Sequence, residues 1–532
     1  MPEQISPVAA KALIHGQAEC ALLDIREHGQ YGEGHPFLSV HCPYSDFEQC
    51  ILRLVPNVDV AVILMDDGDG VAERAAGQAQ GMGYRAVSVI LGGAPAWLSA
   101  GFTLYKGVNL PSKTLGELVE HSHHPQLIQA QTLRAWQSEG RRFHFFDCRP
   151  PNEYAKMTVP GAACIPNGEL AHRLAAVVDD ETTPIVVTCA GRTRSLIGAA
   201  GLGLLGLPNP IYALENGTQG WALAGYDLQR GNGEPDMPGL NETQEGASRQ
   251  RADALIATEN LACVDRGGFL SLAADETRTL YLVDVRSAAE YASGHLAGAE
   301  HAWSGQIAQA ADLTLGVRRA RVVLTDDTGL RAALAAIWLR ALGYEVFILR
   351  DTGAVDLPKD WRRRMPRLPQ AEALAELSAE QVASEHGQGT IDLLDIRSSQ
   401  DYRKSHVQGA RWATRARLSK LAGSVGRNTH WVLLGRDLLL ARYIAQDLAA
   451  LGHRVRGVFA GSLHALREQG LAISASPEMP IDAECIDFLF FVHDRHDGNL
   501  ESARRYLEWE MGLIAQLDID EHASFRLKHS RL

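Results

Sequence analysis

Residues 185–195 read IVVTCAGRTRS, and this stretch indicates how the chain folds. The apolar run 185–187 is typical of a buried parallel strand, and the following residues 196–200, LIGAA, are typical of the first turns of a helix. Cys189 therefore lies where a strand ends and a helix begins. Backbone N–H groups at a helix start carry partial positive charge and lack partners within the helix. We expect a thiol here to ionise readily and to face an anionic ligand, close to Arg192 and Arg194.

The elements around Cys189 belong to a pattern that occurs four times. Each copy begins with an apolar strand that ends in Asp-x-Arg, at residues 22–26, 145–149, 282–286 and 393–397. A second apolar strand, an alanine- and leucine-rich helix and a third strand follow in each copy. Strands that alternate with helices predict βαβ units and a parallel sheet that is covered on both faces. The sequence therefore predicts an α/β protein of four tandem domains, each a parallel sheet flanked by helices.

The predicted boundaries follow these repeats. The four domains are expected at residues 1–108, 109–232, 251–366 and 367–476. A segment rich in Gly, Pro, Glu and Asn, residues 233–250, is predicted to be a linker between the second domain and the third. Residues 477–532 form a C-terminal extension, in which we expect a strand at 488–492 and an amphipathic helix at 501–517.

Composition excludes several functions. The net charge of -13 over 532 residues argues against a general binder of nucleic acid or of anionic membranes. The N-terminus lacks the basic and apolar regions of a secretory signal, and no apolar run is long enough to span a bilayer. Eight cysteines are scattered without Cys-x-x-Cys spacing. We therefore expect a cytoplasmic protein that binds no metal and no cofactor.

Only one of the four copies carries a thiol at the end of its second strand. Cys189 lies 42 residues after Asp147, and the same distance from Asp24 and Asp284 leads to Asp66 and Asp326. In the fourth copy the strand ends at Gly435, which Arg436 and Asp437 follow. An aspartate cannot form a stable persulfide, so the first, third and fourth domains are predicted to be inactive.

These motifs resemble the rhodanese (thiosulfate sulfurtransferase) family. The resemblance rests on the Asp-x-Arg strands and on the Cys-x-x-x-x-Arg loop. Glu-Tyr segments follow the second and third of these strands, and Gly-His segments follow the first and third. The resemblance also rests on the segment NGTQGWALAG at residues 216–225. The second domain departs from the family pattern at Met157-Thr158, where relatives often have Gly-His. The resemblance implies four rhodanese-like domains, of which only the second is catalytic.

The resemblance further implies a two-step mechanism. The thiolate of Cys189 takes the outer sulfur of thiosulfate, sulfite leaves, and cyanide or a thiol then removes the sulfur from the persulfide. Arg192 and Arg194 are expected to hold the anionic donor. The other loop residues are expected to contribute N–H groups that stabilise the developing charge; these are Ala190, Gly191, Thr193 and Ser195.

Arg149 has two interpretations. It could reach the mouth of the site and bind substrate, because strand ends converge there in a parallel sheet. The favoured interpretation is that it pairs with Asp147 and braces the fold, since all four copies contain the pair, including those without a thiol.

Two other functions stay open. Phosphatases and arsenate reductases place Cys and Arg around a similar loop, but those that bind phosphate have five residues between them, whereas four separate Cys189 from Arg194. The second is a persulfide carrier or scaffold whose silent domains bind partners. Among donors, two arginines in the loop favour thiosulfate over mercaptopyruvate. The acceptor, whether cyanide, a thiol or another protein, and the oligomeric state stay open.

Overall fold

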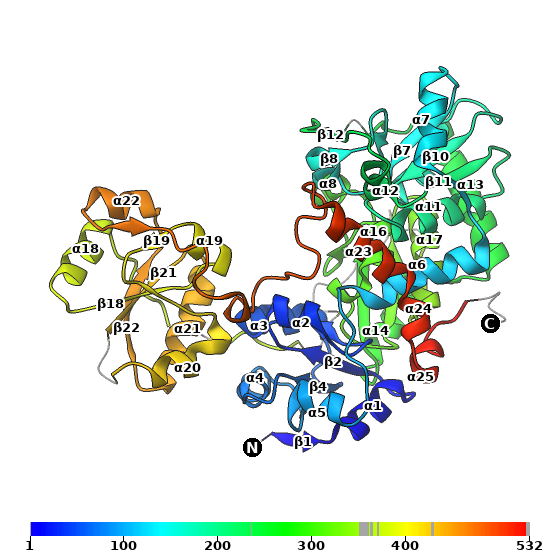
Figure 1. Cartoon of the computed structure of the whole chain (residues 1–532). Coiled ribbons are helices and arrows are strands. Elements are labelled where there is room, and N and C mark those ends of the chain that lie inside the picture. The colour runs from blue at the N-terminus through cyan, green and yellow to red at the C-terminus, as the bar shows by residue number, and fades with distance from the viewer. Residues whose placement is uncertain are drawn as a thin grey trace.

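Each Asp-x-Arg segment lies at the end of a strand inside a parallel sheet. The computed structural model describes residues 2–235, 237–350, 361, 365–369, 372–426 and 430–527. Four sheets built from these residues share one parallel strand arrangement, and we call the units built on them modules 1 to 4. Figure 1 shows module 4, in yellow and orange, set apart from the three others. The predicted fold class is confirmed.

The elements of modules 1 and 2 follow one another in the same way. Module 1 has the strand order β1 (Glu3–Ile5), β5 (Ala86–Ile90), β4 (Ala61–Met65), β2 (Cys20–Asp24), β3 (Val40–His41), with helices α1 (Pro7–His15), α2 (His28–Glu33), α3 (Phe47–Leu54), α4 (Val71–Gly81) and α5 (Gly93–Ser99). Module 2 has the order β6 (Gln126–Ile128), β11 (Ile211–Leu214), β10 (Ile185–Thr188), β7 (His144–Asp147), β9 (Ala163–Cys164), and a small antiparallel pair, β8 (Met157–Thr158) with β12 (Gln229–Arg230). Its helices are α6 (Leu110–His123), α7 (Ala130–Ser138), α8 (Pro151–Lys156), α9 (Glu169–His172), α10 (Leu174–Val177), α11 (Thr193–Gly203) and α12 (Gly217–Leu223).

Modules 3 and 4 repeat this order, with one strand fewer in module 4. Module 3 has the order β13 (Ala262–Val264), β17 (Glu345–Leu349), β16 (Arg321–Thr325), β14 (Leu280–Asp284), β15 (Glu300–His301), with α13 (Glu242–Glu259), α14 (Arg266–Ala274), α15 (Ala288–Ser293), α16 (Ser304–Gln309) and α17 (Leu330–Ala341). Module 4 has β20 (Arg411–Trp412), β18 (Asp392–Asp395), β21 (His430–Leu434), β22 (Arg454–Phe459), and the pair β19 (His406–Val407) with β23 (Ile473–Ser474). Its helices are α18 (Ala379–Gly387), α19 (Ser399–Lys404), α20 (Leu418–Gly423), α21 (Leu438–Ala450) and α22 (Leu463–Glu468).

Strand register places the four strand ends in equivalent positions. The aspartate of each Asp-x-Arg segment pairs with the last residue of the second strand: Asp24 with Met65, Asp147 with Thr188, Asp284 with Thr325, and Asp395 with Leu434. The next residues are Asp66, Cys189, Asp326 and Gly435. The sheets therefore put Cys189 where the other modules have two aspartates and a glycine.

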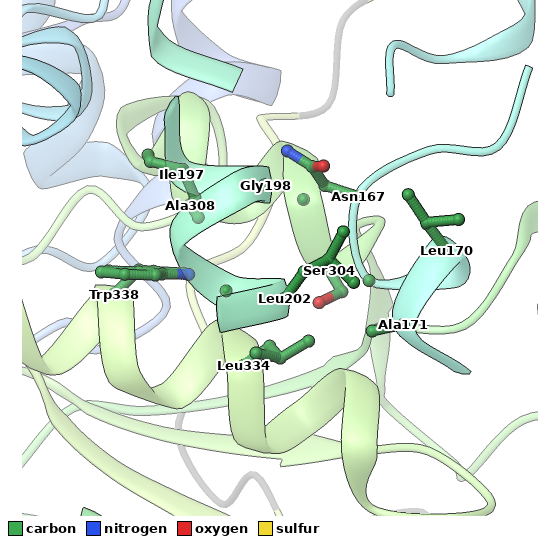
Figure 2. Close-up of a pocket in the computed structure, with 13 residues that line it drawn as sticks. Asn167, Leu170, Ala171, Ile197, Gly198, Leu202, Ser304, Ala308, Leu334 and Trp338 are labelled. Atoms are coloured by element: carbon green, nitrogen blue, oxygen red, sulfur yellow. The ribbon is translucent and has the colours of Figure 1, made fainter. Parts of the chain in front are cut away.

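Modules 2 and 3 pack through helices that adjoin the Cys189 loop. Figure 2 shows Ile197 and Leu202 of α11 facing Ala308 of α16 and Leu334 and Trp338 of α17. A buried ion pair joins the same two modules, because Arg331 donates to Glu169 at 2.7 Å. This interface fixes the helix that carries the loop arginines.

The C-terminal extension is helical, so the strand predicted for it at residues 488–492 is wrong. Residues 488–492 form turns, and α23 (Leu500–Met511), α24 (Leu513–Gln516) and α25 (Ile519–His522) follow. The aromatic run packs on rings instead of pairing with a strand: Phe488 meets Phe490 edge-on at 4.8 Å, and Phe491 meets Trp509 at 6.1 Å. Ring packing buries this apolar surface without a sheet.

The segment predicted as a linker, residues 233–250, is partly helical. Helix α13 begins at Glu242 and runs past the predicted start of the third domain. Asn241 caps it by accepting from the N–H of Gln244, and Ala252 and Leu255 are buried against the core of module 3. The cap and these apolar positions outweigh the polar composition that suggested a linker.

Among the described residues, no helix combines the length and the apolar composition that crossing a bilayer requires.

Arg415 fastens module 4 to module 1. Its side chain is fully buried, donates to both carboxylate oxygens of Glu48 at 2.7 and 2.8 Å, and donates to Asp447 at 2.8 Å. Its guanidinium also lies over the ring of Tyr44, 4.5 Å from the ring centroid.

We expect Arg415→Ala to lower the free energy of unfolding by about 3–5 kcal/mol, because it leaves Glu48 buried without its cation. Urea denaturation measures the loss, and small-angle scattering should report a larger radius of gyration as module 4 separates. The matched control is Arg456→Ala, which removes the exposed pair with Glu385 and should cost less than about 1 kcal/mol. An unchanged unfolding curve for Arg415→Ala would contradict the role of this residue.

Candidate active site

The loop between β10 and α11 holds Cys189 in a buried position. Cys189 directly follows the last residue of β10, and only 2% of its surface is exposed. Its Sγ lies 3.4 Å from Oγ of Ser195, which donates to the carbonyl oxygen of Arg192 at 2.9 Å. The thiol thus faces the first turn of α11, whose N–H groups have no partners within the helix.

Helix α12 holds the loop so that its carbonyl groups point away from the thiol. The N–H of Thr218 donates to the carbonyl oxygen of Cys189 at 2.8 Å, and Gln219 donates through both its backbone and its side chain to that of Ala190. Gly217 permits this contact, since a Cβ there would lie 2.2 Å from the Cys189 oxygen. The motif around residues 216–225 therefore shapes the loop.

The backbone N–H groups of residues 190–195 form a candidate anion cradle. Among the described residues, no hydrogen bond joins the backbone N–H of any residue from 190 to 195 to another protein group. Six such groups around a thiol, together with the start of α11, can receive an oxyanion. Ala190, Gly191, Thr193 and Ser195, predicted to supply N–H groups, are all within this loop.

In modules 1 and 3 an aspartate fills the corresponding cradle. Asp66 accepts from the N–H groups of Gly68 and Ala72 at 2.8 and 2.9 Å. Asp326 accepts from those of Gly329 and Arg331 at 2.6 and 3.0 Å. Each carboxylate occupies N–H groups that an external anion would need, so these modules lack both the nucleophile and the free cradle.

In module 4 a helix cap satisfies the N–H groups at the start of the corresponding helix. Gly435 stands at the cysteine position, and Asp437 caps α21 by accepting from the N–H groups of Leu439 and Leu440 at 3.0 and 2.9 Å. The start of this helix is therefore also satisfied from within the module.

Carboxylates bind both loop arginines. Sequence analysis predicted the arginines but missed these carboxylates. Arg192 donates to the two oxygens of Glu117 at 2.8 and 2.9 Å and also contacts Glu120. Arg194 donates to both oxygens of Glu153 at 2.6 and 2.8 Å, and to Gln306 of module 3 at 3.4 Å. The two guanidinium groups are thus paired, and the loop does not present the net double positive charge that its sequence suggested.

The two pairs differ in electrostatics. Burial raises the pKa of Glu117 to about 7, against the opposing effect of Arg192. Burial acts in the same direction on Glu153, but the charge and hydrogen bonds of Arg194 prevail and lower the pKa of Glu153. Near neutral pH the carboxylate of Glu117, beside Arg192, therefore titrates, whereas the carboxylate of Glu153, beside Arg194, stays charged.

Arg149 braces the fold. It donates to both oxygens of Asp147 and to the carbonyl oxygen of Met157, and its side chain is 1% exposed. The equivalent arginines make the same contacts: Arg26 with Asp24 and the Gly34 oxygen, Arg286 with Asp284 and the Gly294 oxygen, Arg397 with Asp395 and the Ser405 oxygen. Arg149 also lies 4.0 Å from Oε2 of Glu153, the carboxylate that holds Arg194, so it adjoins the loop through this acid.

Module 2 differs from the other modules at Thr158. Three modules have a histidine here that stacks on a tyrosine, as His35 does on Tyr31 at 3.6 Å. In module 2 the Thr158 hydroxyl instead donates to Asp147 at 2.6 Å. The substitution adds a hydrogen bond to the brace.

Other thiols and candidate ligands are already engaged. Cys148 donates to the Thr188 oxygen at 2.9 Å, and burial, followed by the charge of Cys189, raises its pKa well above the usual range. His172, Glu290 and Asp327 lie close enough to share an ion. Arg331 already neutralises the two acids, at 2.8 and 2.6 Å.

Sequence and structure comparisons identify related proteins. The model of the rhodanese-like domain matches residues 6–100, 129–224 and 269–352. A crystal structure of thiosulfate sulfurtransferase from Pseudomonas aeruginosa is 33% identical, covers 99% of each chain and has a TM-score of 0.86. A rhodanese-related protein from Thermoplasma volcanium is 23% identical over 20% of this chain and 97% of its own, with a TM-score of 0.17. No curated protein matches the chain.

Replacing Arg149 tests its role as a brace. Arg149→Met leaves Asp147 buried without its cation, so we expect the free energy of unfolding to fall by about 3–5 kcal/mol. Urea denaturation measures this, with Arg142→Met as the control. The Arg142–Asp179 pair is exposed, and its loss should cost less than about 1 kcal/mol. Equal, small effects of the two substitutions would contradict a bracing role.

Proposed function

The chain belongs to the rhodanese-like family, and we propose that within it this protein is a thiosulfate sulfurtransferase that works through a persulfide on Cys189. One observation carries the proposal: within the described residues, the single thiol among the four equivalent strand ends coincides with the single helix start whose N–H groups no protein carboxylate or cap occupies. General sulfurtransferase activity follows from the family. The donor, the acceptor and the persulfide are the finer steps proposed.

The first half-reaction forms one sulfur–sulfur bond and breaks another. The Cys189 thiolate attacks the outer sulfur of thiosulfate, and sulfite leaves with the electron pair of the bond that breaks. The N–H groups at the start of α11 carry partial positive charge. They also supply fixed donors for the negative charge that moves onto sulfite and onto the terminal sulfur.

The second half-reaction restores the thiolate. Cyanide, or the thiolate of an acceptor, attacks the terminal sulfur of the persulfide and leaves as thiocyanate or as a new persulfide. Cys189 departs with the electron pair and returns to the field of α11. The same six N–H groups serve both steps, so the cradle needs no rearrangement between them.

The roles of the arginines change in this proposal. Since Arg192 and Arg194 are each bound by a glutamate, they contribute to the field of the loop as members of ion pairs. Direct recognition of the donor then depends on the loop N–H groups. We propose Cys189 as the nucleophile, with residues 190–195 forming the cradle.

The proposal predicts a covalent sulfur on one residue. Incubation with thiosulfate should add one sulfur atom to the intact chain, cyanide should remove it, and Cys189→Ala should gain none. Intact mass spectrometry measures all three. A wild-type chain that gains no cyanide-labile sulfur would overturn the sulfurtransferase proposal, and a labelled alanine variant would overturn the assignment of Cys189. Phosphate release from an aryl phosphate would favour phosphatase chemistry instead.

Donor binding should depend on pH through Glu117. Its pKa of about 7 means that lowering the pH from 8 to 6 neutralises this carboxylate and leaves more of the positive charge of Arg192 uncompensated. We expect thiosulfate to bind the Cys189→Ala variant about threefold to tenfold more tightly at pH 6 than at pH 8. The alanine background removes the titration of the thiol, and calorimetry measures binding.

The matched variants isolate this carboxylate. Cys189→Ala with Glu117→Gln should bind thiosulfate with almost the same affinity at both values of pH. The exposed Glu139, changed to Gln in the same background, should leave the dependence intact. A flat profile for Cys189→Ala alone would contradict the prediction.

A further inference from the structure

Helix α23 of the C-terminal extension covers the Cys189 loop. It contacts α6, which carries Glu117 and Glu120, and α12, which shapes the loop. Figure 1 shows this helix, in red, beyond the segment that returns from module 4, and its contacts place it beside module 2. The rhodanese-like matches end at residue 352, so α23 adds a wall that the repeated fold does not contain.

Glu510 is the residue of α23 that reaches the cradle. The Thr193 hydroxyl donates to its Oε1 at 2.5 Å. Its Oε2 is buried and has no hydrogen-bond partner within the described residues. A Cβ placed on Gly191 would lie 3.2 Å from this oxygen. An unpartnered carboxylate oxygen therefore lies against Gly191, in the loop whose N–H groups form the candidate anion cradle.

Among the described residues no cation forms an ion pair with this carboxylate, although Lys113 and Arg192 lie close enough to attract it. Arg192 and Arg194 are bound by other glutamates, as described above. Lys113 of α6 is buried, and its ammonium group contacts the Tyr506 hydroxyl. Tyr506 in turn packs beside Gly191, with its Cε1 3.3 Å from the Cβ position. The negative charge of Glu510 thus acts on whatever occupies the cradle.

The position of Glu510 is comparable with that of the silent aspartates. Asp66 and Asp326 fill their cradles from the same loop and accept its N–H groups. Glu510 approaches the cradle of module 2 from a separate helix and leaves the N–H groups free. An anionic ligand that bound these N–H groups would therefore meet a like charge at close range.

We propose that Glu510 selects the sulfur donor by charge, and weakens the binding of doubly charged donors relative to singly charged ones. This inference rests on the proposed function, because it assumes that a sulfur donor occupies the cradle. The repulsion between Oε2 and a donor scales with the charge of the donor, so thiosulfate experiences twice the repulsion of a monoanion in the same place. Glu510 is in this sense a specificity-determining residue.

The test compares two donors of similar size and different charge. Thiosulfate carries two negative charges and the methanethiosulfonate anion carries one; each gives its outer sulfur to a thiolate, and sulfite or methanesulfinate leaves. The full chain and Glu510→Gln are assayed with cyanide as acceptor. Gln keeps the size of the side chain and an oxygen that can accept from Thr193. We expect the KM for thiosulfate to fall about tenfold and that for methanethiosulfonate about threefold, the square root of the first factor, because repulsion energy is proportional to charge.

Two further variants separate charge from packing. Glu510→Asp keeps the charge, so the ratio of the two KM values should stay within about twofold of the wild-type ratio. Glu508→Gln changes an exposed acid on the same helix and should leave both KM values as they are. Thermal unfolding of each variant confirms that α23 stays in place.

The outcomes distinguish the two proposals. Equal changes of KM for both donors in Glu510→Gln, or no change, would overturn charge selection and leave the sulfurtransferase proposal intact. Failure of the wild type to take sulfur from either donor, seen by intact mass, would overturn the sulfurtransferase proposal itself. A change in the ratio of KM values for Glu510→Gln alone supports charge selection.

Discussion

The N–H groups that follow the second strand of each module need an electronegative partner, and the identity of that partner separates the modules. Asp66 and Asp326 supply it from the first loop position, and Asp437 supplies it as a helix cap. In module 2 the thiol of Cys189 stands at this position, and its N–H groups have no protein partners among the described residues. An aspartate stabilises the helix start in each of the three other modules, whereas the corresponding N–H groups of module 2 are left for a ligand.

The cradle depends on a frame that is the same in all four modules. Each Asp-x-Arg arginine binds its aspartate and a carbonyl oxygen eight residues later. These contacts fix the end of the first strand against the turn that follows, and sheet register then fixes the end of the second strand. Because the frame persists where the thiol is absent, its arginine is better explained by folding than by catalysis. The hydrogen bond from Thr158 to Asp147 adds to the frame in module 2.

The sequence was sufficient for local features and insufficient for distant ones. The repeat predicted the parallel sheets, and a constant spacing from the aspartate placed Cys189, Asp66 and Asp326 at one position. Glu117, which is 75 residues from Arg192, and Glu510, which is 317 residues from Thr193, reach the loop only through tertiary packing. No motif marks either residue. The strand expected at 488–492 failed for a related reason, since aromatic rings bury their surface on one another as readily as in a sheet.

Module 3 and the C-terminal extension take part in the site through the same packing. Gln306 of module 3 contacts Arg194, and the N–H of Gly305 donates to the carbonyl oxygen of Asn167, whose side chain donates to that of Arg194. Module 4 is followed by the helix that brings Glu510 to the cradle. The carboxylates that pair the two loop arginines lie in module 2 itself, on α6 and α8. Module 3 and the extension add Gln306 and Glu510 to a loop whose arginines are already paired, so the field at Cys189 comes mainly from backbone N–H groups and is adjusted by carboxylates from outside the loop.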